Sequence, residues 1–282
     1  MRLRLTLHCL QRNCSIGLSY SYYLSAAIYG WIEQSSAEYS TFLHDRGFPL
    51  EGSVRRFKHF CFSRLNVPQR RIVDGRLEIH SPVIEWFVAM PVEELLQHLV
   101  LGMFEKREFF IEREENRFAV EQVETMPEPE WRRRMAFRML SPLTVSVPED
   151  RYEGSLHQRS PDAEGNLHRN HRVIPHYLRP DDPRLAEALR SNILNKYASL
   201  YGSQPADAEF RCELDQIFIA RRGGPEKVSK LITIKAGCSG ETRVRGFMCP
   251  VTIEGNPELI KLAYESGLGE KGSLGFGMLE VL

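Results

Sequence analysis

The stretch GLGEKGSLGFGMLEVL, from Gly267 to Leu282, is the most distinctive part of this chain. Its glycines are Gly267, Gly269, Gly272, Gly275 and Gly277. Glycine adopts positive φ freely and lets a ligand or another backbone touch the main chain. Successive exposed N–H groups can bind an anion, and Lys271 would add a positive charge. The stretch therefore predicts a loop lying against a phosphate-bearing ligand, with a plain connector between a helix and a strand as the alternative.

Residues 267–272 also match G-x-G-x-x-G, the dinucleotide-binding pattern. That site requires a strand before the glycines and a helix after them. Here a helical pattern that begins at Asn256 and Pro257 comes first, and the strand-like FGMLEVL follows. A P-loop is also excluded, because Lys271 precedes Gly272 instead of a Ser or Thr. The order argues against a nucleotide-dependent enzyme.

The first half of the chain shows a strand, a helix, strands, a helix and again strands. Leu3, Leu5 and Leu7 alternate with polar residues, as in a half-buried strand. The predicted elements are a strand over 2–9, a helix within 20–36, strands over 57–65, 76–80 and 81–90, a helix from Pro91, and one or two strands within 108–124. This order is the ferredoxin-like split βαβ plan.

The same order recurs after a predicted linker, Met126 to Glu130. The elements expected there are a strand over 135–147, a long polar segment over 148–180, a helix begun by Asp182 and Pro183 and closed by Gly202, strands within 208–220, 228–236 and 245–255, a helix from Asn256 to Gly267, and a last strand within 276–282. We predict an α+β fold of two tandem ferredoxin-like (RRM-like) βαββαβ domains, residues 1–127 and 128–282.

The composition does not indicate which kind of molecule the protein binds. The formal net charge of the 282 residues is zero, and 42% of them are hydrophobic, as in ordinary globular proteins. No C-x-x-C pair, no signal peptide and no membrane-length apolar run occurs, so we expect a cytoplasmic protein with free thiols and no membrane contact. Residues 55–71 and 131–138 are basic, and residues 112–130 are acidic. Basic runs with aromatic residues suit single-stranded nucleic acid, although a solvated surface is the ordinary explanation.

GLGEKGSLGFGML closely resembles the C-terminal glycine-rich signature of the CRISPR-associated repeat-RNA endoribonucleases, a family of tandem ferredoxin-like proteins. SYYLSAAIYGWIEQSS and the later FLHDRG resemble the family's first helix and the loop with its catalytic histidine. KHFCFS resembles the strand that follows, and MLSPLTVSV resembles the start of the second domain. These matches occur in order along the whole chain.

The resemblance implies an endoribonuclease that cuts precursor CRISPR RNA within each repeat, without a metal or other cofactor. The RNA's own 2′-OH attacks the adjacent phosphate and leaves a 2′,3′-cyclic phosphate and a 5′-OH. The implied partners are CRISPR repeat RNA, other CRISPR effector proteins and a second copy of the chain in a homodimer. A catalytically weak or inactive repeat-RNA binding protein is the alternative.

By the same resemblance, His44 is the general base, and Tyr29 orients the scissile phosphate or the leaving oxygen. An imidazole titrates near neutral pH, which suits proton abstraction. Lys58 aligns with a lysine that stabilises the transition state. The gap between His44 and Lys58 is longer than the resemblance leads one to expect, so Arg55, Arg56 and His59 are alternatives for that third role.

The remaining predictions concern RNA binding and metals. Gly267, Gly269, Lys271, Gly272, Gly275 and Gly277 are the predicted RNA-binding residues. The histidines of the polar segment are His157, His168, His171 and His176. Structural zinc sites pair histidines with nearby cysteines, and the nearest one, Cys212, is well downstream. We predict no metal site there and read the segment as a basic loop.

Overall fold

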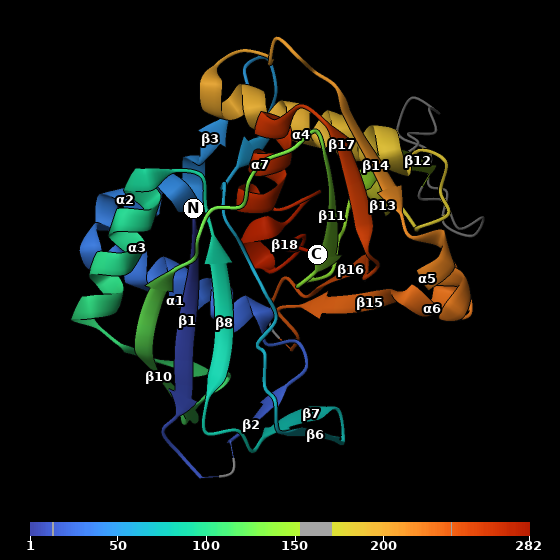
Figure 1. The fold of residues 1–282 in the computed structure, drawn as a ribbon. Helices are drawn as coiled ribbons and strands as arrows, with labels where there is room; N and C mark the ends of the chain where they lie inside the picture. The colour runs from blue at the N-terminus through green and yellow to red at the C-terminus, as the bar shows by residue number, and fades with distance from the viewer. Residues whose placement is uncertain (13, 153–170, 238) are drawn as a thin grey trace, which may run out of the picture.

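The computed structural model describes residues 1–12, 14–152, 171–237 and 239–282 (Figure 1). The elements of the first half are β1 (Arg2–Cys9), β2 (Cys14–Gly17), α1 (Ser21–Ser35), α2 (Ala37–Thr41), the π-helix η1 (Phe42–Arg46), β3 (Phe48–Pro49), β4 (Arg56–Phe57), β5 (Cys61–Phe62), β6 (Arg70–Val73), β7 (Arg76–Ile79), β8 (Ile84–Ala89), α3 (Glu93–Glu105), β9 (Glu108–Ile111) and β10 (Arg113–Thr125). Those of the second half are β11 (Arg134–Met139), β12 (Ser146–Tyr152), β13 (His171–Tyr177), α4 (Leu185–Tyr201), β14 (Phe210–Leu214), α5 (Gln216–Arg221), α6 (Pro225–Val228), β15 (Ser229–Ile234), β16 (Thr242–Phe247), β17 (Val251–Gly255), α7 (Pro257–Ser266), the 3₁₀ turn η2 (Gly272–Leu274) and β18 (Leu279–Val281).

The first half forms an antiparallel sheet with the strand order β5-β8-β1-β10-β9. Central β1 buries Leu3, Leu5 and Leu7, as their alternation predicts. Helices α1 and α3 pack against each other, and Gly102 makes this close approach possible. A Cβ there would lie 1.7 Å from the Trp31 carbonyl oxygen. The chain order β1-α1-β5-β8-α3-β10 is the predicted βαββαβ unit.

The second half repeats this arrangement with the strand order β14-β17-β11-β18 and the chain order β11-α4-β14-β17-α7-β18. The last helix begins where the sequence predicts, since the Asn256 side chain caps the N–H of Glu258 and Pro257 occupies the first turn. Gly202 ends α4 in the left-handed conformation, also as predicted. The α+β fold of tandem ferredoxin-like domains is confirmed.

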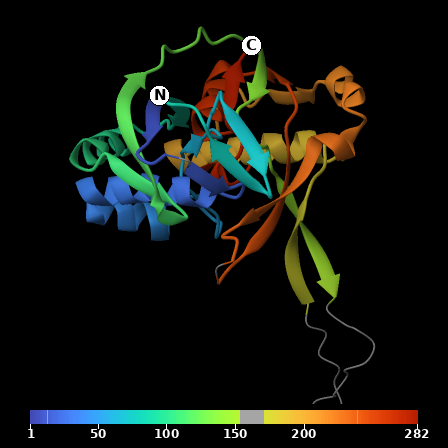
Figure 2. The ribbon, with the colours of Figure 1, turned by 90° about the horizontal axis from the view of Figure 1, so that it is seen from below.

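Each half has its own buried apolar cluster, one within residues 3–120 and one within residues 135–279. No helix or strand lies between Thr125 and Arg134, and this segment runs along the outside of the molecule from β10 to β11 (Figure 2). The predicted linker, Met126 to Glu130, falls within it. The predicted boundary between residues 127 and 128 lies there too and stays a prediction.

Several predicted strands are shorter than expected, and the one predicted over 135–147 ends at Met139, with β12 beginning at Ser146. The strand predicted over 57–65 is reduced to β5, because His59 has a positive φ of 49° and breaks the extended conformation. The strand predicted within 208–220 ends at Leu214, because the Asp215 side chain accepts from the Phe218 N–H and starts α5. Short-range capping overrides strand propensity there.

Two predicted helix starts are wrong by a few residues. The helix expected from Pro91 begins at Glu93, because Val92 is extended. The helix expected from Asp182 and Pro183 begins at Leu185. Asp182 binds the guanidinium and the backbone N–H of Arg184 at 2.8 to 3.0 Å, which holds these residues in a turn before the helix.

The polar segment over 148–180 is partly regular, contrary to the predicted loop. Strands β12 and β13 pair as an antiparallel hairpin that extends from the body of the molecule (Figure 2). His176 lies 3.3 Å from the Glu149 carboxylate, and His171 lies at the start of β13. His157 and His168 lie outside the described residues.

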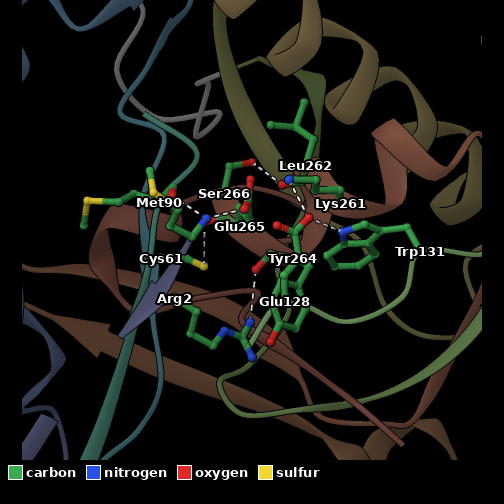
Figure 3. A network of polar contacts seen from close by, with 11 residues as sticks. Arg2, Cys61, Met90, Glu128, Trp131, Lys261, Leu262, Tyr264, Glu265 and Ser266 are labelled. Atoms are coloured by element: carbon green, nitrogen blue, oxygen red, sulfur yellow. Dashed lines mark hydrogen bonds and ion pairs between the residues drawn. The ribbon is translucent and has the colours of Figure 1, made fainter. Parts of the chain in front are cut away.

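The two domains meet through a buried polar junction (Figure 3). The Arg2 guanidinium, with only 4% of the residue exposed, donates to the carbonyls of Tyr264 and Leu279 at 3.1 and 2.6 Å. The same guanidinium lies 3.4 Å from the centre of the Tyr264 ring. The Cys61 thiol donates to the Glu265 carbonyl at 3.6 Å. Strand β1 and strand β5 are thereby fixed to α7.

Among the described residues, no helix is both long and apolar enough to cross a bilayer. The cysteines described as free are Cys9, Cys14, Cys61, Cys212 and Cys249.

Candidate functional site

His44 lies on η1, a single π-helical turn at the end of α2. The Gly47 N–H closes this turn by donating to the Phe42 carbonyl at 2.7 Å. Gly47 has a φ of 57°, and a Cβ there would lie 2.6 Å from the Phe57 carbonyl, so only glycine fits. Single π turns are frequent at functional sites. The His44 side chain is 73% exposed, which leaves its ring open to a substrate.

Asp45 fixes one nitrogen of this imidazole. Its Oδ1 lies 2.8 Å from His44 Nδ1, and a carboxylate can only accept, so Nδ1 carries the proton. Nε2 is then the unprotonated, basic nitrogen. The sequence analysis missed Asp45, although its position next to the histidine was a signal.

Tyr29, on α1, packs its ring edge to face against the His44 ring at 5.6 Å and against Phe60 at 5.7 Å. Burial raises the pKa of Tyr29 to about 12, and a hydrogen bond with the Ser273 side chain opposes that rise. The phenol therefore keeps its proton at neutral pH and can act as a donor. Ser273 belongs to the glycine-rich segment, so this tyrosine connects α1 of the N-terminal domain with the glycine-rich segment of the C-terminal domain.

Lys58 completes the group. Its Nζ donates to the carbonyls of Leu43 and His44, which both belong to η1. Burial lowers the pKa of Lys58, while Asp45 raises it. An ammonium has three N–H donors, so one is left for a substrate oxygen.

The three alternatives to Lys58 differ in their exposure to solvent. Arg55 and Arg56 are exposed before the turn that carries Lys58. His59 is only 3% exposed, and its Nε2 lies 2.8 Å from Ser199 Oγ on α4. It therefore faces the interior of the protein and not the exposed His44 ring, and this position argues against His59 as the third catalytic residue.

The glycine-rich segment follows α7 and precedes β18, in the predicted helix-then-strand order. Most of its glycines lie in close contact with other parts of the protein, where a side chain would not fit. A Cβ on Gly269 would lie 2.4 Å from the Thr144 carbonyl oxygen, and one on Gly277 would lie 2.0 Å from the Leu268 carbonyl oxygen. Cβ atoms on Gly272 and Gly275 would collide with Phe60 and Phe62 of the N-terminal domain at 2.7 and 2.6 Å. The segment thus joins the two domains.

RNA contact by this segment stays a prediction, and the structure narrows where it could occur. Gly267, Gly269, Gly275 and Gly277 are buried, whereas Lys271 and Gly272 are half-exposed. Lys271 Nζ lies 5.9 Å from the centre of the Tyr177 ring of β13. The part of the segment available to a ligand is therefore 271–274, beside Tyr29.

The family model described as "CRISPR associated protein Cas6, C-terminal" matches residues 126–281, and "CRISPR-associated protein Cas6, N-terminal" matches residues 15–124. The chain belongs to the Cas6 family. It is 24% identical over 264 residues to the "CRISPR-associated endoribonuclease Cas6 1" of Methanocaldococcus jannaschii, covering 94% of this chain and 86% of that protein.

Two further comparisons agree. A "CRISPR-associated endoribonuclease-like protein Cas6" of Pyrococcus furiosus is 26% identical over 283 residues, covering 100% of this chain and 99% of that protein. A solved structure described as "Characterization of a Cas6-related gene from Pyrococcus furiosus" superposes with a TM-score of 0.77 at 24% identity, covering 100% and 98% of the two chains. The superposition supports the Cas6 fold of this chain.

This Cas6 family member also has a pocket of about 310 Å³, here called the basic pocket, between the N-terminal domain and the region of β15 and β16. Its lining residues are Arg64, Pro142, Phe218, Arg222, Lys227, Val228, Lys230, Gly246, Phe247 and Met248. Four of these are cations and none is acidic. The Arg222 guanidinium lies 5.1 Å from the centre of the Phe218 ring. Cations beside an aromatic ring suit a phosphate and a stacked base.

The basic run over 131–138, by contrast, is neutralised within the protein. Arg133 pairs with Asp207 and Glu209, and Arg134 and Arg138 pair with Glu254 and Glu280 on neighbouring strands. These ion pairs are solvent-exposed and span the strands of the second sheet. The ordinary explanation, a solvated surface, holds for this run.

Within the described part of the chain, no three His, Cys, Asp or Glu side chains converge in a way that could hold a metal ion.

Proposed function

We propose that this Cas6 family member is a metal-independent endoribonuclease that cuts precursor CRISPR RNA within its repeats. The observation that supports this best is the convergence of Tyr29 and Lys58 on His44, whose Nε2 is open to solvent. The name of the Methanocaldococcus jannaschii relative supports the same activity and the same RNA system.

The proposed reaction begins with proton transfer. His44 Nε2 takes the proton of the 2′-OH next to the cut, while Asp45 accepts from Nδ1–H and holds the ring. The 2′-oxygen attacks the adjacent phosphorus as the bond from phosphorus to the 5′-oxygen breaks. The leaving 5′-oxygen takes up a proton from water, and the exposed His44 imidazolium returns its extra proton to the solvent, so the products are a 2′,3′-cyclic phosphate and a 5′-OH.

Tyr29 and Lys58 act on the phosphate. The protonated Tyr29 hydroxyl donates to the scissile phosphate or to the leaving oxygen. The Lys58 ammonium donates to the Leu43 and His44 carbonyls of η1. Its remaining N–H group and its positive charge are directed at the phosphorane. Donors that are fixed before the reaction stabilise developing charge best.

RNA would be held outside this cluster as well. The half-exposed residues Lys271 and Gly272 and the cations of the basic pocket offer further phosphate contacts. We place the reaction in the cytoplasm, and CRISPR effector proteins and a second copy of the chain stay predicted partners.

The decisive experiment incubates the purified protein in EDTA with RNA that carries the CRISPR repeat of its own genome. One cut with a cyclic phosphate end, lost when the nucleotide before the cut is 2′-deoxy, is the expected result. Random cleavage, or a cut that survives the 2′-deoxy substitution, would disprove the mechanism.

A repeat-RNA binding protein without cleavage is the second candidate. Two N–H groups of Lys58 already bind backbone carbonyls, which weakens the third catalytic role. The Pyrococcus furiosus relative is named endoribonuclease-like, and it matches this chain along its whole length. Tight, salt-sensitive binding of repeat RNA without any cut would select this function.

A further inference from the structure

His59 has an unusual backbone for a residue with a side chain. Its φ is 49°, in the left-handed region that non-glycine residues seldom occupy. The residue lies between β4 and β5, where it interrupts the strand expected there. A conformation of this kind persists only where the surroundings hold it.

The imidazole of His59 is locked from both domains. The Phe48 ring meets it edge to face at 5.0 Å, and the Phe57 ring stacks on it at 5.7 Å. Its Nε2 lies 2.8 Å from Ser199 Oγ, on α4 of the C-terminal domain. This polar contact therefore crosses the domain boundary.

The network assigns the tautomer of His59. Ser199 Oγ donates its proton to the Lys196 carbonyl at 2.8 Å, so the same oxygen must accept from His59 Nε2–H. Nδ1 is then unprotonated and is buried without a hydrogen-bond partner. His59 is thus neutral and cannot serve as a proton donor to RNA.

Tyr29, His44 and Lys58 are here called the cleavage cluster, and both neighbours of His59 contact its other members. Lys58 extends to the carbonyls of Leu43 and His44, and Phe60 packs on the Tyr29 ring at 5.7 Å. A change in the backbone of His59 would displace both neighbours at once. Displacement of reacting groups by about 1 Å can lower a rate by about 10²-fold.

We propose that Ser199 and His59 are positioning residues for RNA cleavage. The contact from His59 Nε2–H to Ser199 Oγ holds the left-handed turn that presents Lys58 to η1 and Phe60 to Tyr29. The C-terminal domain thereby completes the catalytic site of the N-terminal domain. This inference rests on the proposed endoribonuclease function.

The test compares Ser199→Ala with Ser199→Thr, which keeps the hydroxyl, and with Ser191→Ala, an exposed serine on the same helix. Single-turnover cleavage and RNA affinity are measured separately. We expect Ser199→Ala to cleave about tenfold more slowly at unchanged affinity, and both other variants to cleave like the wild type. Wild-type cleavage by Ser199→Ala, or equal loss of rate and affinity, would overturn the proposal.

Two substitutions of His59 test the backbone. Glycine adopts a φ of 49° without strain, whereas alanine does not. Since both remove the imidazole, His59→Gly should cleave faster than His59→Ala if the turn itself matters. The opposite order would contradict a positioning role.

A readout without RNA separates this inference from the proposed function. Labelling with an amine reagent, followed by peptide mass spectrometry, reports how freely Lys58 reacts, with Lys230 of β15 as reference. We expect the relative reactivity of Lys58 to rise severalfold in Ser199→Ala and to stay unchanged in Ser191→Ala. Unchanged reactivity overturns the positioning role. If the wild type fails to cut repeat RNA, the proposed function fails, while the labelling result still decides the inference.

Discussion

The ring of Tyr29 meets the ring of His44 edge to face at 5.6 Å, and the hydroxyl of the same tyrosine bonds to Ser273 of the glycine-rich segment. One side chain therefore connects the exposed base to the part of the C-terminal domain that lies against α1. Ser25 of α1 strengthens this connection by donating to the Ser273 carbonyl at 2.7 Å.

Replacement of His44 by alanine should abolish most of the cleavage and spare binding. Loss of a general base lowers rates by about 10²- to 10⁴-fold. Because the side chain is 73% exposed, its removal disturbs little packing. Single-turnover cleavage and a filter-binding assay check the two effects, with His80→Ala as an exposed control. Wild-type cleavage by His44→Ala would refute the assignment.

Tyr29→Phe keeps the packing of the ring and removes only its hydroxyl. We expect cleavage to fall by about 10²-fold, as for the loss of one donor to a transition state. Since the pKa of Tyr29 is about 12, the hydroxyl stays protonated across the accessible range, and the wild-type rate should not decline below pH 10 through its ionisation. An unchanged cleavage rate in Tyr29→Phe would show that the hydroxyl takes no part in cleavage and that Tyr29 contributes only by packing.

The double substitution Arg222→Ala and Lys230→Ala should weaken RNA binding without changing the cleavage rate at saturating RNA. Each lost phosphate contact lowers the slope of log affinity against log salt by about 0.7 for single strands. Affinity is measured from 50 to 300 mM salt, roughly the range over which such slopes are resolved. Arg134→Ala serves as control, because this arginine is paired with Glu254. An unchanged slope would exclude the basic pocket from RNA binding.

Acid should destabilise the protein through His59. Burial and the nearby Lys196 lower its pKa from 6.5 to about 3, so the unfolded chain binds a proton that the native protein does not. The free energy of unfolding is therefore not reduced by His59 above pH 6.5, and it falls progressively as the pH falls from 6.5 toward 3. Between pH 7 and 4.5 the wild type should lose about 2 to 3 kcal/mol more than His59→Asn. Equal losses in urea unfolding would contradict the buried neutral state.

Gly269→Ala should destabilise the protein by about 3 kcal/mol or more, because a left-handed backbone and a clash add up. The Cβ would lie 2.4 Å from the Thr144 carbonyl oxygen. Gly52→Ala is the matched control, since Gly52 has a similar φ of 70° with nothing within 4 Å. Thermal unfolding of both variants measures the difference. Equal midpoints would show that the packing at Gly269 is dispensable.

Periodicity and capping predicted most of the fold. The alternation of Leu3, Leu5 and Leu7 gave β1, and Asn256 with Pro257 gave the start of α7, because these signals act within a few residues. The break at His59 could not be predicted, since Ser199 holds it from another domain. Long-range contacts of this kind leave no local pattern.

The cleavage cluster was predicted by resemblance and not by spacing. Tyr29, His44 and Lys58 lie on separate elements, namely α1, η1 and the turn between β4 and β5, and no local pattern predicts that these elements meet. The basic pocket was missed because its four cations come from separate parts of the chain: Arg64 follows β5, Arg222 follows α5, and Lys227 and Lys230 lie on α6 and β15. The close packing of the glycines against Thr144, Leu268, Phe60 and Phe62 could not be predicted, because a sequence does not show which backbone or side chain comes close to a glycine.

The packing of the glycines has an evolutionary consequence. The segment that marks the family is held in place by the meeting of two domains, whereas the imidazole at position 44 is 73% exposed and its ring contact is with Tyr29 at the surface. Selection for a folded protein therefore preserves the signature and ignores the histidine. A duplicated copy could lose the proposed nuclease activity by a single substitution at His44 and persist as a carrier of RNA, with its signature intact.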